Sequence, residues 1–315
     1  MKETPLLLHV GLEKTGSSTL QETLLYKHPQ VHYLGKIKGN DSKQKSCLDE
    51  ITYRILDPIL WNLDEPMNTE ATLALFHDKL LPSVSEDQIL VGSWEGLGSQ
   101  AIKAQIEMLN RTQAIFGGCR IMITLRNPLS RLPSLYLQNL YGNFMKQKKG
   151  IFDSHDYVDI ETWFSKRMSN EKLFTYVDFI QSSIEQLGRE NVGIFLFEEL
   201  KEDPNAYYKS ICEFMGIDSE IGVSLTQNKH VNPRMSEEQL TYMHSIQSSF
   251  FKRSLNSFRS VKSRKNALRA KKSGPPAKVI LTDHIIQKVS DASREGHRWL
   301  VENLNLPLER YGYPL

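Results

Sequence analysis

Cysteine is scarce in this chain, and the spacings by which cysteine and histidine bind metals are missing. The 315 residues include three cysteines, which stand singly, at Cys47, Cys119 and Cys212. An odd number argues against a disulfide framework and favours a reducing compartment, so we expect the cytoplasm. His28 and His32 are four residues apart, but Pro29 interrupts the helix that such a metal-binding pair needs. We therefore expect no metal requirement, and we interpret His9, on the first strand, as a satisfied core histidine.

Long apolar runs are missing as well. No segment approaches the ~20 consecutive apolar residues of a membrane-spanning helix. The first apolar run stops at Val10 with no cleavage region after it, so no signal peptide is expected. The composition, with 40% hydrophobic and 24% charged residues, is typical of a globular protein. We expect a single domain over residues 1–315.

The most informative segment is 6–20, where an apolar strand leads through a short loop into an amphipathic helix. Besides Lys14, the loop and the first helical turn contain Thr15, Gly16, Ser17, Ser18 and Thr19. Unpaired N–H groups and the positive end of a helix dipole converge at such a point, and Lys14 adds a full charge. The pattern predicts a phosphate or sulfate site, although an ordinary turn capped by Gly and Ser is the alternative. It is not a Walker A motif, in which Lys directly follows the second Gly.

A second anion site is predicted where the apolar strand 121–125 ends. Arg126 follows this strand directly, at the carboxyl edge where open α/β sheets bind ligands. Its guanidinium matches the geometry of a phosphate, and Ser134 in the following helix can donate a hydroxyl. Two anion sites, each at a strand-to-helix junction, suit a nucleotide with phosphates at both its 5′ and its 3′ position.

These two segments resemble the nucleotide-binding motifs of sulfotransferases that use 3′-phosphoadenosine 5′-phosphosulfate (PAPS). Residues 14–20 (KTGSSTL) resemble the 5′-phosphosulfate loop, and residues 126–136 match the 3′-phosphate motif R-x-P-x-x-R-x-x-S-x-Y at every fixed position. The resemblance implies that Lys14 neutralises the oxygen between phosphate and sulfate and that Arg126 and Ser134 hold the 3′-phosphate. It also implies that the 5′-phosphate is held by the segment made of Thr15, Gly16, Ser17, Ser18 and Thr19.

The expected fold is α/β, with a central parallel sheet flanked by helices, as in the P-loop-like sulfotransferases. Predicted strands at 31–35, 88–92, 120–125 and 191–197 join the first strand and alternate with helices at 69–81 and 101–116, which is a βαβ pattern. Residues 191–216 are similar to the family's strand, turn and Asp-Pro helix. Residues 153–186 are expected to be helical and to form a lobe over the active site.

The predicted general base is Glu95, in the segment 91–96 just after a predicted strand. Several carbohydrate-type members of the family carry a Ser-x-Glu segment here, and the resemblance implies that its carboxylate takes the proton of the acceptor. The alternatives are a solvent-facing Glu in a loop and a different base, His230, in a segment that resembles a late family loop (227–234). Position rather than sequence decides between such candidates.

One stretch, 252–272, has nine Lys or Arg and no acid. Because the net charge of the chain is +2, removing these nine charges leaves −7 for the rest. We expect a basic insertion at about 252–276, either a solvated helix or a platform for an anionic acceptor or a membrane surface. Nucleic acid is not expected, because Phe258 is the one aromatic residue within 252–272.

The sequence therefore predicts a PAPS-dependent sulfotransferase that sulfates an acceptor hydroxyl, on a carbohydrate or a glycolipid. Two other classes stay open. A nucleotide-dependent kinase would use a similar fold, but it would need a Walker lysine and Mg²⁺ ligands. A non-catalytic protein that binds anionic glycans would keep the basic stretch, but it would have no reason to carry two phosphate sites.

Overall fold

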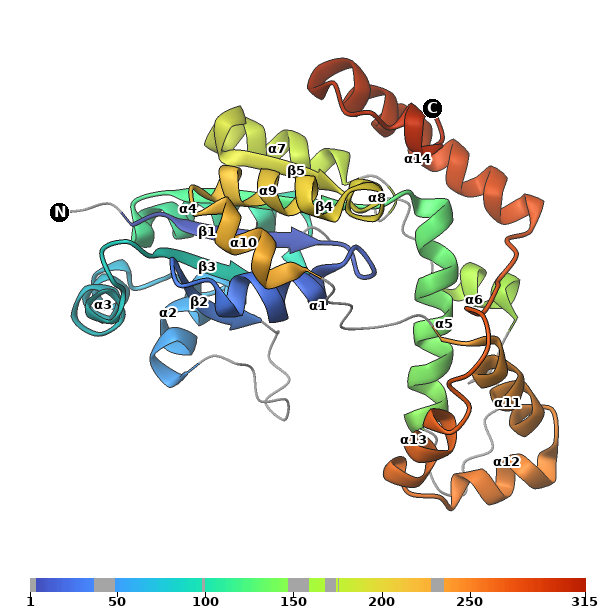
Figure 1. Ribbon diagram of the computed structural model, residues 1–315. Coiled ribbons are helices and arrows are strands. Elements are labelled where there is room, and N and C mark those ends of the chain that lie inside the picture. The colour runs from blue at the N-terminus through green and yellow to red at the C-terminus, as the bar shows by residue number, and fades with distance from the viewer. Residues whose placement is uncertain are drawn as a thin grey trace. The chain divides into compact units, whose positions relative to one another are not determined.

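The computed structural model describes residues 4–36, 49–97, 100–146, 159–167, 174, 176–227 and 235–315 (Figure 1). The chain forms two compact units. The sheet unit comprises Met1–Arg126, Thr175–Val231 and Trp299–Leu306, and the helical unit comprises Asn127–Phe174, Asn232–Arg298 and Pro307–Leu315. The expected single domain stays a prediction, because compactness alone does not show whether the two units fold independently.

The sheet unit is built on five parallel strands in the order β2-β3-β1-β4-β5. The strands are β1 (Leu6–Gly11), β2 (Val31–Lys36), β3 (Ile89–Ser93), β4 (Cys119–Leu125) and β5 (Val192–Leu196). β1 and β4 consist almost entirely of buried residues, as expected for a parallel sheet that is covered on both faces. The expected α/β fold is thus confirmed, with each strand within two residues of its predicted position.

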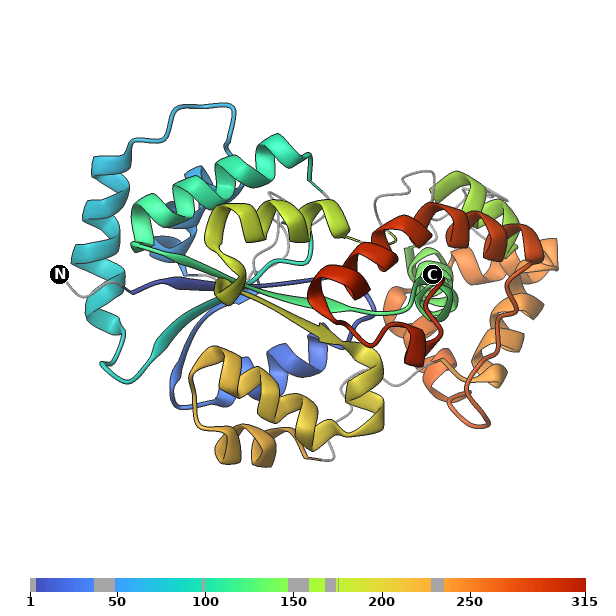
Figure 2. The ribbon, with the colours of Figure 1, turned by 90° about the horizontal axis from the view of Figure 1, so that it is seen from above.

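Helices cover both faces of this sheet (Figure 2). One face is covered by α4 (Ile102–Phe116) and α7 (Val177–Leu187), and the other by α1 (Ser17–Leu20), α9 (Pro204–Met215) and α10 (Ser219–Thr226). The remaining elements of this unit are α2 (Glu50–Leu60), α3 (Thr69–Leu75), α8 (Phe197–Glu202) and the turns η1 (Gln21–Leu25), η2 (Phe76–Leu80), η3 (Leu81–Ser83) and η7 (Arg189–Asn191). Asp203 caps α9 with its carboxylate, and Pro204 occupies the first helical position.

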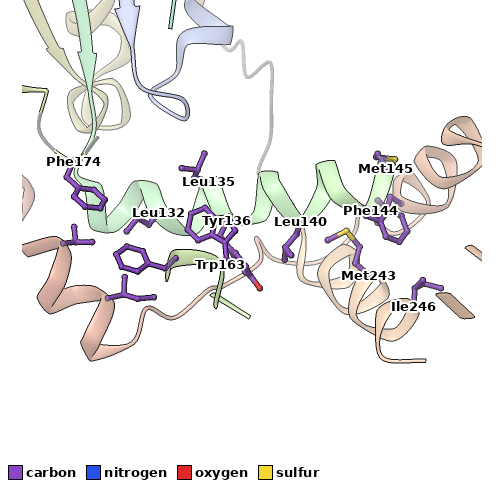
Figure 3. Packing of buried hydrophobic residues seen from close by; sticks show 14 residues of the cluster. Leu132, Leu135, Tyr136, Leu140, Phe144, Met145, Trp163, Phe174, Met243 and Ile246 are labelled. Atoms are coloured by element: carbon purple, nitrogen blue, oxygen red, sulfur yellow. The ribbon is translucent and has the colours of Figure 1, made fainter. Parts of the chain in front are cut away.

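The helical unit is organised around α5 (Pro128–Lys146). Leu132, Tyr136, Leu140 and Phe144 recur every four residues and form one buried stripe along this helix (Figure 3). The other elements of the unit are α6 (Ile160–Arg167), α11 (Glu237–Gln247), α12 (Phe250–Ser257), α13 (Val261–Arg269), the turn η8 (Glu309–Tyr311) and most of α14 (Asp283–Leu304). Trp163 of α6 meets the ring of Tyr136 edge-on at 5.6 Å, which closes the core on that side.

Two sequence expectations differ from the described structure. The described residues of 153–186 form the helices α6 and α7, which belong to different units, so the segment is not one continuous helical lobe. Residues 197–200, which we expected to end the strand and form a turn, belong to helix α8 (Phe197–Glu202). Tyr176, the residue before α7, has a left-handed backbone with a φ of 55°, so α7 begins as a new helix at Val177.

Candidate active site

The carboxyl ends of the five strands lie at one edge of the sheet unit, because all five strands run in the same direction. β1 ends at Gly11, β3 at Ser93, β4 at Leu125 and β5 at Leu196. The strand order reverses at β1, which lies between β3 and β4, and such a reversal is where open α/β sheets bind ligands. Three of the predicted site segments, those containing Lys14, Glu95 and Arg126, follow these strand ends.

The loop after β1 has an unusual backbone. Lys14 has a φ of 74° and Gly16 a φ of 90°, so two left-handed residues flank Thr15. A non-glycine residue in this region is uncommon and costs energy, and such residues concentrate at functional sites. Gly11 is needed at the start of the loop, because a Cβ there would overlap the Thr124 hydroxyl of β4. The start of the loop is therefore packed closely against the neighbouring strand.

The N-terminus of α1 offers backbone donors. Thr19 and Leu20 both bond through their N–H groups to the carbonyl of Gly16, whereas the residues described show no carbonyl partner for the N–H groups of Ser17 and Ser18. α1 has four residues and continues directly into the π-helical turn η1 (Gln21–Leu25). Free N–H groups at the start of a helix are suited to hold an anion.

A buried network of hydrogen bonds joins the loop to the strands beneath it and to η1. Gln21 Nε2 donates to Ser93 Oγ (2.7 Å), which is bonded to His9 Nδ1 (2.8 Å), and His9 Nε2 lies 3.4 Å from Thr124 Oγ1. Thr124 is bonded in turn to Thr15 Oγ1 (2.8 Å). These side chains, which are all buried, come from β1, β3, β4, the loop and η1.

The donors and acceptors in this hydrogen-bond network follow from Thr15. Thr15 donates its single hydroxyl hydrogen to the carbonyl of Leu12 at 2.7 Å, so it accepts from Thr124 and from Ser17. Thr124 is then free to accept from His9 Nε2, which leaves Nδ1 of His9 to accept from Ser93. For a neutral ring the network assigns the hydrogen to Nε2, and it confirms that His9 is a satisfied core histidine.

Arg126 joins the loop to α8. Its side chain is 9% exposed, and Nη1 donates to the backbone oxygen of Lys14 at 2.9 Å. The guanidinium also lies over the ring of Phe197, 4.6 Å from its centroid, and the same ring packs against Gly16. Arg126 is therefore held by the backbone of Lys14 and the ring of Phe197 as a cation that is already partly desolvated.

Lys14 and Glu95 are electrostatically coupled. Burial lowers the pKa of the Lys14 ammonium below 10.5, the nearby Arg126 lowers it further, and the carboxylates of Glu13 and Glu95 oppose both effects. Glu95 is half-buried just past the end of β3, and Trp94 beside it is fixed by an N–H bond to the carbonyl of His9 (2.9 Å). The predicted cation and the predicted base thus act on one another at the same sheet edge.

The other predicted site residues are not among the described residues of the sheet unit. Ser134 is half-buried on α5 and belongs to the helical unit, whereas Arg126 belongs to the sheet unit. His230 lies outside the described residues, as does Cys47. The residues of the network that the sequence did not indicate are Gln21, Ser93 and Thr124. The polar residues Ser93 and Thr124, each near the end of an apolar strand, were the available signal.

Comparison with known protein families identifies the family to which this chain belongs. The model of the sulfotransferase domain family matches residues 5–291, nearly the whole chain. The chain is a sulfotransferase. This match confirms the resemblance to PAPS-dependent sulfotransferases, and it makes this protein an enzyme of sulfuryl transfer. No curated protein matches the chain significantly.

Several solved structures resemble this sulfotransferase at low sequence identity. A sulfotransferase from Alicyclobacillus acidocaldarius is 18% identical, with a TM-score of 0.45, and the match covers 83% of this chain and 98% of that one. Mouse sulfotransferase SULT7A1, in a complex with PAP, is 15% identical with a TM-score of 0.48, over 99% of this chain and 89% of that one. STF9 from Mycobacterium avium is 12% identical with a TM-score of 0.41, over 85% and 76%.

The described residues offer neither a membrane-spanning helix nor a metal-binding cluster. No described helix combines the length and the apolar character that crossing a membrane requires. Within the same residues, no three His, Cys, Asp or Glu side chains gather in a way that could hold a metal ion. Cys119 and Cys212 are free and buried, and burial raises the pKa of each thiol to about 12, so neither is a nucleophile at neutral pH.

Proposed function

We propose that this sulfotransferase moves the sulfuryl group of PAPS to an acceptor hydroxyl on a carbohydrate or a glycolipid. The observation that supports this most is the convergence of two cations on one loop. Arg126 from the end of β4 donates to the backbone oxygen of Lys14 in the loop after β1, at 2.9 Å. Two partly desolvated cations beside the first N–H groups of a helix suit a compact, highly charged anion.

In this assignment the loop binds the 5′-phosphosulfate. The N–H groups of Ser17 and Ser18 and the backbone of the loop hold the 5′-phosphate. The hydroxyls of Thr15 and Ser17 are bonded to each other at 3.2 Å, so the half-buried Ser18 is the better hydroxyl donor. Lys14 neutralises the charge that develops on the oxygen leaving sulfur, because sulfuryl transfer, like phosphoryl transfer, has a loose in-line transition state.

Glu95 is the proposed general base. Its carboxylate takes the proton of the acceptor hydroxyl as the new oxygen–sulfur bond forms and the bond from sulfur to the phosphate oxygen breaks. Its place after β3 and its electrostatic coupling to Lys14 support this role, since base and leaving-group cation must act on opposite sides of one sulfur. His230 remains the competing base.

The 3′-phosphate is assigned to Arg126 and Ser134. Arg126 supplies the charge, and the covered face of its guanidinium is oriented by Phe197. Ser134 is assigned because it occupies the serine position of the motif at 126–136. A planar cation and a hydroxyl are the usual partners of a phosphate.

A carbohydrate or glycolipid acceptor is proposed from the Ser93-Trp94-Glu95 segment, which resembles the Ser-x-Glu of carbohydrate-type sulfotransferases. The two free buried thiols fit the proposed cytoplasmic compartment. The kinase alternative is disfavoured because Lys14 precedes Gly16, whereas the Walker lysine follows its glycine.

Thermal unfolding with two nucleotides tests the proposal. We expect 3′-phosphoadenosine 5′-phosphate at a hundredfold excess over its Kd to stabilise the protein by about 2.7 kcal/mol, and ATP with Mg²⁺ to stabilise it much less. The reverse order would favour the kinase. Stabilisation by neither nucleotide, together with binding of a sulfated polysaccharide, would favour the glycan-binding protein. An acceptor screen with labelled PAPS then identifies the hydroxyl.

A further inference from the structure

Helices α12 and α13 expose an unusual number of large apolar side chains. Within the described residues, twelve large hydrophobic side chains are exposed, and five of them lie in the short segment 250–261. We call these five the apolar face, and they are Phe250, Phe251, Leu255, Phe258 and Val261. Each is 56–70% exposed, well beyond the isolated surface hydrophobics that any protein carries.

The pattern of burial on α12 is inverted. A helix on the surface of a globular unit normally turns its apolar side toward the core. On α12, Phe251 and Leu255 are exposed, whereas Asn256 and Ser257 are almost fully buried. Phe251, Leu255 and Phe258 are spaced by four and three residues, so they lie along one side of the helical turn. The outward side of α12 is thus its apolar side.

Arg264 holds this inverted orientation in place. Its side chain is 2% exposed and donates to the carbonyls of Asn256 (3.1 Å) and Ser257 (3.2 Å) at the end of α12. It also donates to the carbonyls of Phe144 (3.3 Å) and Met145 (2.8 Å) at the end of α5. A buried cation with four carbonyl partners fixes the C-terminus of α12 and the start of the connection to α13. The apolar face is therefore held outward by the fold itself.

The apolar face lies among basic residues. The exposed cations of the basic segment 252–272 are Lys252, Arg259, Lys262, Lys265, Arg269, Lys271 and Lys272. The segment 252–272 contains no acid that would pair with them. Large apolar side chains surrounded by lysines and arginines are typical of helices that lie in the interface of an anionic bilayer.

We propose that α12 and α13 form a docking surface for an anionic lipid bilayer. The apolar face enters the boundary between headgroups and acyl chains, while the surrounding lysines and arginines contact lipid phosphates. Charge complementarity favours a bilayer over a protein partner, because a single sign of charge extends over the whole segment. The aromatic and aliphatic side chains favour it over a soluble polyanion, which would need the cations alone. The surface does not depend on the proposed acceptor.

Vesicle binding by the full chain tests the proposal. We expect the protein to sediment with phosphatidylcholine vesicles that contain phosphatidylglycerol, and not with vesicles of phosphatidylcholine alone. The double variant Phe251→Ser/Leu255→Ser should lose at least about tenfold in affinity, since each side chain loses its burial in lipid. Lys262→Ala should lose about fivefold, the usual effect of one basic residue near an anionic surface. Ile280→Ser is the matched control, because Ile280 is exposed in the same unit outside the apolar face.

A probe in the apolar face distinguishes insertion from adsorption. We expect Phe258→Trp to add a fluorescence component that shifts to the blue on anionic vesicles and is quenched by brominated acyl chains. The proposal would be overturned if the protein bound heparin and anionic vesicles equally well and Phe251→Ser/Leu255→Ser bound vesicles as tightly as wild type. The surface would then be a site for polyanions. Failure to bind anionic vesicles would also overturn it, as would dimerisation in solution that the same double variant abolishes.

Discussion

This sulfotransferase has two positively charged regions that are built in opposite ways. In the loop after β1, Lys14 and Arg126 are partly desolvated, and each is fixed through the other: the guanidinium of Arg126 bonds the backbone of Lys14 and stacks on Phe197. In the segment 252–272, by contrast, seven cations are exposed, and the one fully buried cation, Arg264, donates to backbone carbonyls. The first region concentrates charge at a point, and the second spreads it over a surface.

The difference indicates what each region can bind. Partly buried cations interact strongly with a nearby charge because water screens them poorly, so a few residues suffice for one compact anion. Exposed cations contribute little individually and are screened by salt, so they act together on an extended anionic partner. Substitutions should therefore have large, specific effects in the loop and small, additive ones in the helices.

The largest effect on turnover should come from Glu95, the carboxylate that is coupled to Lys14. Glu95→Gln keeps the shape of the side chain but removes the proton acceptor, so we expect turnover to fall by ~10²–10⁴, the usual loss for a general base. Nucleotide affinity should stay intact, because the loop and Arg126 are unchanged. Rates of sulfate transfer from labelled PAPS, measured with nucleotide titrations, check both expectations.

A pH profile identifies the base independently. Glu95→Gln should remove the acidic limb of the rate, whereas His230→Ala should leave it. Near-normal turnover in Glu95→Gln, together with collapse in His230→Ala and a limb near the ordinary imidazole pKa of ~6.5, would assign the base to His230. The sulfotransferase activity itself would stand.

The next largest effect on turnover should come from Lys14, the partly buried cation of the loop. Lys14→Ala should lower turnover by at least ~10²–10³, as for loss of one transition-state donor, with a smaller effect on nucleotide affinity because the backbone donors remain. Lys262→Ala, in the spread region, is the matched control and should leave turnover toward a water-dissolved acceptor unchanged. A loss of affinity at constant turnover would show that Lys14 only binds.

Two buried arginines extend the comparison to binding and stability. Arg126→Ala should weaken binding of 3′-phosphoadenosine 5′-phosphate by roughly 1.5–3 kcal/mol, the usual contribution of a hydrogen bond to a charged group. Arg264→Met should leave that affinity unchanged and lower the free energy of unfolding by about 1.5–3 kcal/mol, because the four carbonyls lose a charged donor. Isothermal titration and denaturant unfolding of both variants separate the two roles. The assignment of Arg126 would fail if its variant were folded and bound the nucleotide as tightly as wild type.

The same contrast separates what the sequence predicts from what it does not. The strands and the loop at Lys14 were predictable, because apolar runs and the Gly and Ser residues after them are local signals. The His9 network was not, because Ser93 and Thr124 reach His9 only through the register of three parallel strands. The inverted orientation of α12 was not predictable either. It depends on Arg264, which the sequence presents as one of nine similar cations and which the fold buries.

The smallest effect we predict is the pH dependence of Lys14 itself. Because burial and Arg126 lower its pKa in the folded chain, the unfolded chain binds more protons between that pKa and 10.5, and the nucleotide-free protein gains stability as pH rises through this range. A bound phosphate favours the charged form and raises the pKa again. Affinity for 3′-phosphoadenosine 5′-phosphate is therefore complete below the folded pKa and falls as pH rises through it.

Lys14→Arg and Lys14→Met test this sign. Arginine stays charged throughout the range, so Lys14→Arg should hold its affinity on the alkaline side, while Lys14→Met should be weaker and flat. An exposed lysine keeps a pKa near 10.4, so the wild-type fall should begin below that value. If Lys14→Met kept the same alkaline fall, the titrating group would be another residue. The desolvation that distinguishes this loop from the exposed cations of α12 and α13 would then have no effect on binding.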